Sequence, residues 1–384
     1  MNQSGTVAQV SYLSSVFQLH KLSYFDMSQL PTPQLIKSAT LPSQVYLPNV
    51  LEYTSRVFGL KTNPHHREAE AESYEWFATF GIHNETKLQK FFEAGFGHMT
   101  ALCYPECDFA HLRVTMDFVL WLFSFDDLTD AGGLDSVQGM KRAVDVTMKV
   151  LRDPTSPPPK FKVAAMLHSY FNRMREDGSE ATIRHFIDAV DFYTKAVYQQ
   201  KVNRSDDRTP SIDEYIQLRR DTSAMKIAWA VLEYSLCMDL PDEVVNHPVV
   251  KELADAGNDI LTWANDIYSF PIEFARGDTH NFVCVAMEHK RLDLNGAIEF
   301  VNKLTRQRLD DYVAAKAQLP SFGPGLDEQV AQYLKGIEYC VQGFIEWTFL
   351  TPRYFGNEAL QVKETGVVNL MAPITLEAHV VVEA

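Results

Sequence analysis

Apolar and polar residues follow a helical period along most of the chain from about residue 50 onward. The clearest example is segment 108–125, where an apolar residue recurs at steps of four, three and four: Leu112, Met116, Val119, Phe123. Residues at this spacing share one face of an α-helix, so the segment is predicted to be a helix with one buried side. A run of aspartates, beginning at Asp126, follows at its C-terminal end.

Loop-forming residues divide the helical pattern into separate elements. Gly132 and Gly133 interrupt it first, and the proline-rich segment 153–159 interrupts it again. The later predicted helices cover residues 160–175, 179–201, 211–236, 248–276, 293–317 and 326–348. Strand signals are few and short, and no internal repeat is detectable, so we expect an all-α fold.

The chain is expected to form one folded domain. Residues 1–40 have no sustained period and are predicted to be an N-terminal extension, and residues 356–384 a C-terminal tail that only docking would order. Between them, segment 41–355 contains no linker rich in Gly, Ser or Pro. It is predicted to be a single, mostly α-helical domain.

Composition narrows the set of partners. The 384 residues carry a net charge of −15, which disfavours a nucleic acid or an anionic membrane as partner. No apolar run approaches the ~18 residues of a transmembrane helix, and no basic-then-apolar segment suggests a secretory signal. Five scattered cysteines complete no zinc site, so we expect a reduced, cytoplasmic protein.

The aspartate run is the first candidate metal site. Asp126 and Asp130 lie one helical turn apart, with Asp127 beside them. Three carboxylates this close repel one another unless a cation lies between them, and hard oxygen ligands suit magnesium. A solvated acidic helix end is the alternative. The pairs Asp206-Asp207 and Asp310-Asp311 lack a third carboxylate at this spacing and are interpreted as surface residues.

A second candidate site combines an amide, a hydroxyl and a carboxylate. Asn265, Ser269 and Glu273 follow one another at steps of four, so their oxygens project from one helix face. Together they would form a chelate of low charge for a hard cation. A polar trio at this spacing is more often a solvated face. The overlapping set of Asn258, Thr262 and Asp266 has the same spacing, and spacing alone leaves both sets open.

Two basic elements complete the set of candidate residues. Arg219-Arg220 lies within a predicted helix, and Arg353-Tyr354 follows the last long helix. Guanidinium groups bind phosphate oxygens in bidentate fashion, and a tyrosine hydroxyl can add a neutral donor. Each element alone is unremarkable.

The four elements together, in this order, resemble the class I terpene synthases, and most closely the fungal, basidiomycete-type sesquiterpene synthases. The first arginine lies 46 residues before Asn265, and Arg353 lies 80 residues after Glu273. The resemblance covers roughly residues 41–355. It favours the set beginning at Asn265 over the overlapping set. It also implies a single α-helical bundle of the class I terpenoid synthase type, with a central active-site cavity.

The resemblance also implies a function and its parts. The expected reaction is magnesium-dependent ionisation of a linear prenyl diphosphate, with farnesyl diphosphate favoured, and cyclisation or quenching of the carbocation to a sesquiterpene. Three Mg²⁺ ions are expected, with Mn²⁺ as an alternative, in a protein that is a monomer or a homodimer. The metal ligands would be Asp126, Asp127, Asp130, Asn265, Ser269 and Glu273.

Diphosphate and cavity residues are implied in the same way. Arg219 would sense the diphosphate, with Arg220 as the alternative, and Arg353 and Tyr354 would bind it when the site closes. The residues expected to face the substrate are Val119, Leu122, Phe123 and Trp347, with Trp263 near the motif helices.

The chain departs from the family pattern at two places. Many relatives have Lys immediately before the last metal ligand, where this chain has Ile272, and Lys226 is a candidate replacement. Segment 221–224 lacks the glycine that relatives often carry near a helix break. Both differences concern the ionisation step and not the class of reaction.

Other functions remain as alternatives. The first is an acyclic terpene alcohol synthase of the linalool or nerolidol type, which would accept geranyl or farnesyl diphosphate. A chain-elongating prenyltransferase would carry two Asp-rich motifs, and a proton-initiated cyclase an Asp-x-Asp-Asp motif, and neither pattern is present. A catalytically silent helical metal-binding module is the non-enzymatic alternative.

Overall fold

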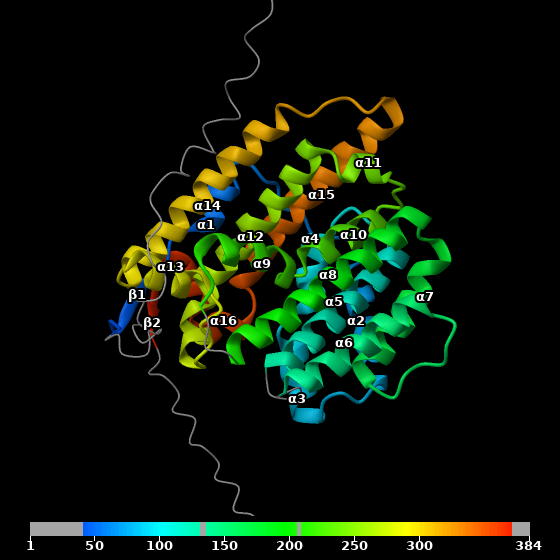
Figure 1. Ribbon diagram of the computed structural model, residues 1–384, viewed down its shortest axis with the longest axis horizontal. Helices are drawn as coiled ribbons and strands as arrows, with labels where there is room; N and C mark the ends of the chain where they lie inside the picture. Colours follow the sequence, from blue (N-terminus) through cyan, green and yellow to red (C-terminus); the bar gives the residue numbers. More distant parts are fainter. Residues whose placement is uncertain (1–40, 131–135, 206–208, 371–384) are drawn as a thin grey trace, which may run out of the picture.

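The computed structural model describes residues 41–130, 136–205 and 209–370 of the 384-residue chain. Within these ranges the structure is helical apart from one pair of three-residue strands (Figure 1). The predicted all-α fold is therefore confirmed. The expected extension 1–40, the Gly132-Gly133 break and Asp206-Asp207 lie outside the described residues.

The elements follow one another along the chain with mostly short connections. In order they are β1 (Gln44–Tyr46), α1 (Val50–Thr54), α2 (His66–Thr79), α3 (Glu85–Glu93), α4 (Phe96–Cys103), α5 (Phe109–Asp130), α6 (Val137–Arg152), α7 (Lys162–Asp177), α8 (Glu180–Ser205), α9 (Ile212–Thr222), α10 (Met225–Ser235), α11 (Asp242–Val245), α12 (Pro248–Ala275), α13 (Phe282–Lys290), α14 (Leu294–Lys316), α15 (Pro324–Thr348), α16 (Pro352–Phe355), η2 (Gly356–Glu358), α17 (Ala359–Thr365) and β2 (Val367–Asn369).

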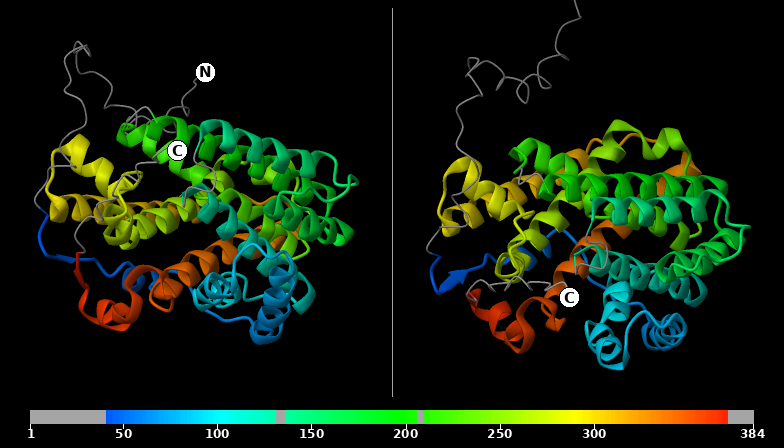
Figure 2. Two further views of the ribbon diagram at one scale, coloured as in Figure 1. Left: turned by 90° about the horizontal axis from the view of Figure 1, so that it is seen from below. Right: turned by 60° about the horizontal axis from the view of Figure 1, so that its bottom comes forward.

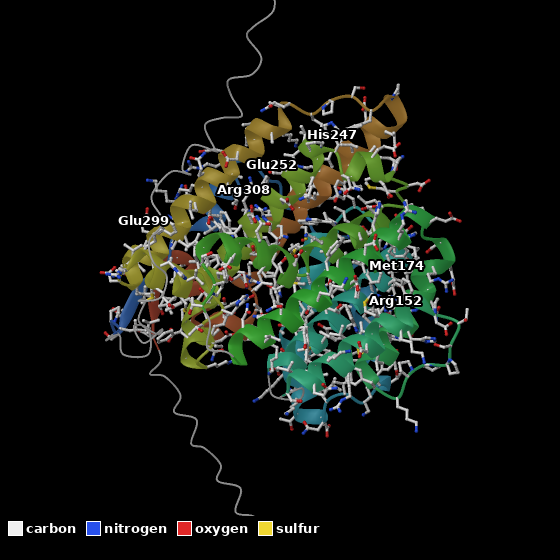
Figure 3. All side chains as sticks on the ribbon, in the orientation of Figure 1. Arg152, Met174, His247, Glu252, Glu299 and Arg308 are labelled. Atoms are coloured by element: carbon white, nitrogen blue, oxygen red, sulfur yellow. The ribbon has the colours of Figure 1, made fainter. Side chains whose placement is uncertain are left out.

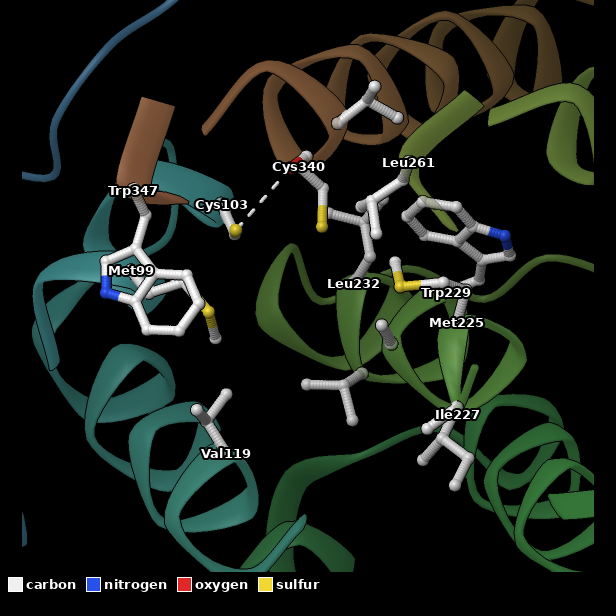
Figure 4. Packing of buried hydrophobic residues seen from close by; sticks show 14 of the residues in the cluster. Met99, Cys103, Val119, Met225, Ile227, Trp229, Leu232, Leu261, Cys340 and Trp347 are labelled. Carbon is white, nitrogen blue, oxygen red and sulfur yellow. Dashed lines mark hydrogen bonds between the residues drawn. The ribbon is translucent and has the colours of Figure 1, made fainter. Parts of the chain in front are cut away.

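The core lies between α4, α5, α10, α12 and α15. Met99, Val119 and Trp347 lie across from Leu232 and Met225 inside this ring of helices (Figure 4). All five side chains are buried. The apolar stripe predicted on α5 does face this core, because three of its four members are buried and the fourth packs against the cluster.

One long predicted helix is two helices in the structure. The hydrophobic pattern predicts one continuous helix over residues 211–236, but in the structure α9 ends at Thr222 and α10 begins at Met225. Ala224 between them has φ +61°, a left-handed conformation that residues other than glycine rarely adopt. Ser223 donates a hydrogen bond from Oγ to Asn258 Oδ1 at 2.9 Å, which ties the break to α12.

Helix α15 approaches α4 closely at a glycine. A Cβ atom added to Gly343 would lie 2.7 Å from the backbone carbonyl of Leu102, so no larger residue fits without a shift. One helical turn later, Trp347 donates from Nε1 to the carbonyl of Ala94 at 3.0 Å. These contacts fix the end of α15 that leads into Arg353.

The chain after α16 returns to the beginning of the described structure. Strand β2 pairs antiparallel with β1, with Gln44 opposite Asn369 and Tyr46 opposite Val367. The pair lies at one edge of the molecule (Figure 2). Residues 356–370 thus contact α16 through η2 and α17, and β1 through β2.

Two further expectations are tested by the fold. None of the helices in the described ranges combines the length and the apolar character needed to cross a membrane. The five cysteines form no disulfide, as expected.

Candidate active site

The aspartate run lies at the C-terminal end of α5, where the apolar stripe ends. Asp126 and Asp127 are half-buried. Asp130 is the last residue of α5, and its side chain lies outside the described residues. A helix C-terminus disfavours negative charge, so these carboxylates need a positive partner.

The amide, hydroxyl and carboxylate trio lies on the inner face of α12. Ser269 is 3% exposed, and Asn265 and Glu273 are half-buried. Burial, together with the nearby carboxylates Asp278 and Asp266, raises the pKa of Glu273 to about 8. The ionised carboxylate is therefore poorly compensated by the protein itself, as expected of a side chain that binds a cation.

Arg219 is fixed by a buried network between α9 and α12. Its Nε and Nη2 donate to Asp266 Oδ1 at 3.1 and 2.9 Å, and Nη2 also donates to Asn265 Oδ1 at 2.9 Å. Tyr215, one turn earlier on α9, donates its hydroxyl to the other oxygen of Asp266 at 2.6 Å. Burial alone would lower the pKa of Arg219, but Asp266, Tyr215 and Glu273 together more than offset this effect, and the pKa is raised. The guanidinium is therefore permanently charged beside Asn265.

Arg220 has different partners from those of Arg219. Its Nε and Nη2 bind both oxygens of Asp259 at 2.7 and 2.6 Å, and Arg308 of α14 donates to the same carboxylate at 2.8 Å. Arg308 also pairs with Glu252, and both lie on the α12–α14 side of the molecule (Figure 3). Despite these cations, burial raises the pKa of Asp259. Asp259 thus connects α9, α12 and α14 through the two arginines, whereas the neighbouring Arg219 is the one that contacts Asn265.

Helix α16 links the two motif helices. Tyr354 Oη accepts a hydrogen bond from Asn265 Nδ2 at 2.9 Å, and Arg353 Nη2 lies 3.4 Å from Asp127 Oδ1. Burial raises the pKa of Tyr354, so its hydroxyl stays protonated and can donate. Residues 353 and 354 therefore reach α5 and α12 from one short helix.

Aromatic rings surround the Arg353 guanidinium. Its central carbon lies 5.4 Å from the centre of the Phe96 ring and 5.2 Å from that of Phe123. The two rings are stacked, with centres 4.2 Å apart. Cation–π contacts of this kind hold the arginine at the end of α5.

The expected cavity residues all lie in or against the apolar core. Val119 and Trp347 are buried, and Leu122 and Phe123 are half-buried and pack against the core cluster. The Trp347 ring contacts the rings of Phe123 and Tyr354. Trp263 is also buried and packs edge-on against Phe282.

The overlapping trio on α12 is structural. Asn258 donates to the carbonyl of Arg220 and accepts from Ser223, and Thr262 donates to its own helix backbone. The third member, Asp266, positions Arg219 as described above. The surface interpretation of Asp310-Asp311 is also consistent with the structure, because both residues are exposed.

The candidate replacement for the absent lysine lies elsewhere. Lys226 forms an ion pair with Asp221 and lies 5.3 Å from the centre of the Phe192 ring. Neither partner belongs to the candidate site, so the structure does not support Lys226 as a substitute at Ile272.

The donor chemistry at the site fits hard divalent cations. Carboxylate, amide and hydroxyl oxygens are present, and ligand sets of this kind suit Mg²⁺. In the described part of the chain, no three His, Cys, Asp or Glu side chains gather so as to hold a metal ion alone. The candidate ligands are instead divided between α5 and α12, an arrangement that leaves coordination positions for water and a phosphate ligand.

Sequence reasoning did not assign a supporting role to three residues of this network. Tyr215 lies one helical turn before Arg219, so helical spacing could have indicated it. Asp266 was considered only as a member of the overlapping set. Asn281, at the N-terminus of α13, contacts Glu273 but had no such signal. Its position depends on how α13 folds back on α12.

Known proteins resemble this chain over most of its length. Residues 117–311 match the family model described as terpene synthase family 2, C-terminal metal binding. The sesquiterpene synthase Agr1 of Cyclocybe aegerita is 35% identical over 328 residues, covering 85% of this chain and 93% of that protein. The alpha-muurolene synthase of Coprinopsis cinerea is 33% identical over 338 residues, covering 86% and 78%.

Solved structures agree on the fold. The crystal structure of an α-eudesmol synthase superposes with a TM-score of 0.69 at 19% identity, covering 77% of this chain and 97% of that one. At this identity the likeness concerns the fold alone. The expected bundle type is confirmed.

Proposed function

Since the chain belongs to the terpene synthase family, with fungal sesquiterpene synthases as relatives over most of its length, we propose that its substrate is farnesyl diphosphate. The enzyme would release diphosphate and convert the resulting carbocation to a sesquiterpene. The relatives do not favour the acyclic alcohol synthase, and as a member of this enzyme family the chain is not a silent binding module.

One observation supports the assignment of these residues to the diphosphate and metal sites. Arg219 and Tyr354, 135 positions apart in sequence, both hydrogen-bond Asn265, while Arg353 beside Tyr354 reaches Asp127. Four separate motifs thus meet through direct contacts. A diphosphate placed among them would find cationic and neutral donors on one side and cation-binding oxygens on the other.

Metal ions have a place in this arrangement. The family is described as metal-binding, and we assign Mg²⁺, as three ions, to Asp126, Asp127, Asn265, Ser269 and Glu273, with Asp130 as a further ligand. Bound cations would neutralise the diphosphate and make it a better leaving group. The raised pKa of Glu273 supports this assignment, because a cation would relieve the repulsion among the carboxylates.

The protein's own residues would perform the remaining tasks. Arg219, fixed by Asp266, would hydrogen-bond the diphosphate without reorganising, and Arg353 and Tyr354 would donate to it from α16. Asp127 would exchange its contact with Arg353 for a cation. No nucleophile is needed.

The apolar interior has a separate role. Buried side chains of α4, α5, α10, α12 and α15 would exclude water, which would otherwise capture the carbocation early. Val119, Leu122, Phe123 and Trp347 are the proposed residues that contact the hydrocarbon chain, and the aromatic rings among them would stabilise positive charge.

The test is turnover with matched variants. Asp126→Asn and Asn265→Leu should abolish release of diphosphate from farnesyl diphosphate and leave the circular dichroism spectrum unchanged. The control is Asp310→Asn, an exposed aspartate on α14, which should behave as wild type. Near-normal turnover in Asp126→Asn would refute the metal assignment.

A further inference from the structure

Asn281 is a buried amide that lies outside the sequence motifs and contacts two of the proposed cation ligands. The residue is 0% exposed. Its Nδ2 lies 3.0 Å from Glu273 Oε2 and 3.5 Å from Ser269 Oγ, and it donates to the backbone carbonyl of Asp266 at 2.7 Å. One amide group therefore touches the same stretch of α12 at three points.

The other end of the Asn281 side chain is also fixed. Its Oδ1 accepts a hydrogen bond from Val283 N at 2.8 Å and caps the N-terminus of α13. The next backbone amide, that of Phe282, lies 3.3 Å from Asp266 Oδ2. Because both ends are held, the amide has little freedom to turn away from Glu273.

Helix α12 needs support at this point. Pro271 lies inside the helix between Ser269 and Glu273, where it has no backbone N–H and crowds the carbonyl four residues earlier. The last turns, which carry Ser269 and Glu273, are thus held less firmly by the helix itself. The bond from Asn281 to Asp266 O supplies an external connection at the start of this stretch.

The chemistry of the amide suits a supporting role. An asparagine side chain has two N–H donors, and here Asp266 O and Glu273 Oε2 take them. A carboxylate held at one oxygen presents the other oxygen, Oε1, in a defined direction. Groups that orient metal ligands in this way commonly affect metal affinity as strongly as the ligands do.

We propose that Asn281 is a positioning residue that orients Glu273 and Ser269 for binding a divalent cation. The inference rests on the proposed function to the extent that it takes these two residues as cation ligands. The competing interpretation is that Asn281 only caps α13.

Asn281→Ser separates the two roles. Serine keeps a capping oxygen but lacks the amide that reaches Glu273. The matched control is Asn49→Ser, because the Asn49 side chain also caps a helix, α1, by accepting a hydrogen bond from Glu52 N at 3.0 Å, and Asn49 is exposed. If Asn281→Ser does not fold, Asn281→Thr, which also caps and fills more of the space, replaces it.

Two readouts are measured against Mg²⁺ concentration. The first is the Mg²⁺ needed for half-maximal turnover of farnesyl diphosphate, and the second is the rise in melting temperature with Mg²⁺ and inorganic pyrophosphate, which requires no turnover. We expect the Asn281 variant to need roughly tenfold to a hundredfold more Mg²⁺ in both, and excess Mg²⁺ to restore turnover. Asn49→Ser should respond as wild type.

The outcomes are distinct. A wild-type Mg²⁺ requirement in the Asn281 variant, or an equal change in both variants, would overturn the proposal. If wild type does not turn over the substrate but its Mg²⁺-dependent stabilisation is weakened in the Asn281 variant, the proposed function fails and the positioning role stands.

Discussion

Replacing Asp266 by Asn tests whether a buried carboxylate places Arg219 in the active site. Asp266 is 1% exposed and accepts hydrogen bonds from Tyr215, Arg219 and the backbone amide of Phe282. Asparagine has nearly the same shape but no charge. The Arg219 side chain, 15% exposed, would then retain Asn265 Oδ1 as a partner but lose its counter-ion.

The expected loss of stability follows from this burial. Removing one charge of a buried ion pair costs roughly 3–5 kcal/mol, and an isosteric amide should lie near the lower limit, at about 3 kcal/mol. With an unfolding entropy of about 2.1 cal/mol/K per residue over the roughly 320 described residues, this lowers Tm by about 4 °C.

The expected kinetic loss has a different origin. A hydrogen bond from the charged Arg219 to the diphosphate would contribute roughly 1.5–3 kcal/mol. If Asp266→Asn misplaces Arg219 and this bond is lost, kcat/KM should fall roughly tenfold to a hundredfold. Release of diphosphate is measured by a coupled pyrophosphate assay. Unfolding is followed by circular dichroism.

Asp259→Asn is the matched control. Asp259 is also buried on α12, and its partners are the neighbouring Arg220 together with Arg308. We expect Asp259→Asn to lose at least as much stability as Asp266→Asn, while kcat/KM stays within about twofold of wild type at temperatures where both are folded. An equal kinetic loss in both variants, or none in Asp266→Asn, would refute the reasoning.

Two further predictions concern stability. Burial alone would lower the pKa of His185, but its hydrogen bonds and charge interactions with Glu233 and Asp242 together more than offset this, and the pKa is raised. The protonated imidazole therefore contributes its full stabilisation of the folded state below about pH 6.5, and this contribution is lost as pH rises through the raised pKa. The difference in Tm between wild type and His185→Gln should shrink over the same pH range. A difference in Tm that stays constant with pH would contradict this prediction. Gly343→Ala should destabilise by roughly 1–3 kcal/mol in urea unfolding, because α4 leaves no space, whereas Gly325→Ala, with nothing within 4 Å, should be neutral or stabilising. Equal changes in the free energy of unfolding for the two glycine variants would contradict the explanation that close packing against α4 causes the loss at Gly343.

The sequence predicted those parts of the fold that local pattern determines. The helix carrying Asp126 and the one carrying Asn265 are present with boundaries close to those expected, because their apolar faces are long and regular. The break at Ala224 was not predicted, since no Gly or Pro marks it. Its left-handed backbone depends on contacts with α12, which local sequence does not contain.

The sequence did not predict the pairing of the two strands either. Strands β1 and β2 are three residues each and more than 300 positions apart, so neither has a recognisable pattern of its own. Residues 356–384 were expected to be a tail, and within the described residues strand β2 of this segment pairs with β1.

At the site, sequence reasoning identified candidate ligands more readily than the residues that support them. The spacing of Asn265, Ser269 and Glu273 follows from helix geometry, and the structure places all three on the inner face of α12. The sequence left open which of the two neighbouring arginines reaches Asn265, because this depends on the rotation of α9 against α12. In the structure Arg219 contacts Asn265, and Arg220 contacts Asp259. Asn281 could not be predicted, because the fold alone brings it to Glu273.

The most direct test of the account is turnover of farnesyl diphosphate by the purified protein with and without Mg²⁺. Released diphosphate is quantified, and volatile products are identified by gas chromatography with mass spectrometry. The account predicts a sesquiterpene and stoichiometric diphosphate with Mg²⁺, and neither when the metal is removed with EDTA. No release of diphosphate from farnesyl diphosphate with Mg²⁺ present, or equal release without the metal, would contradict it.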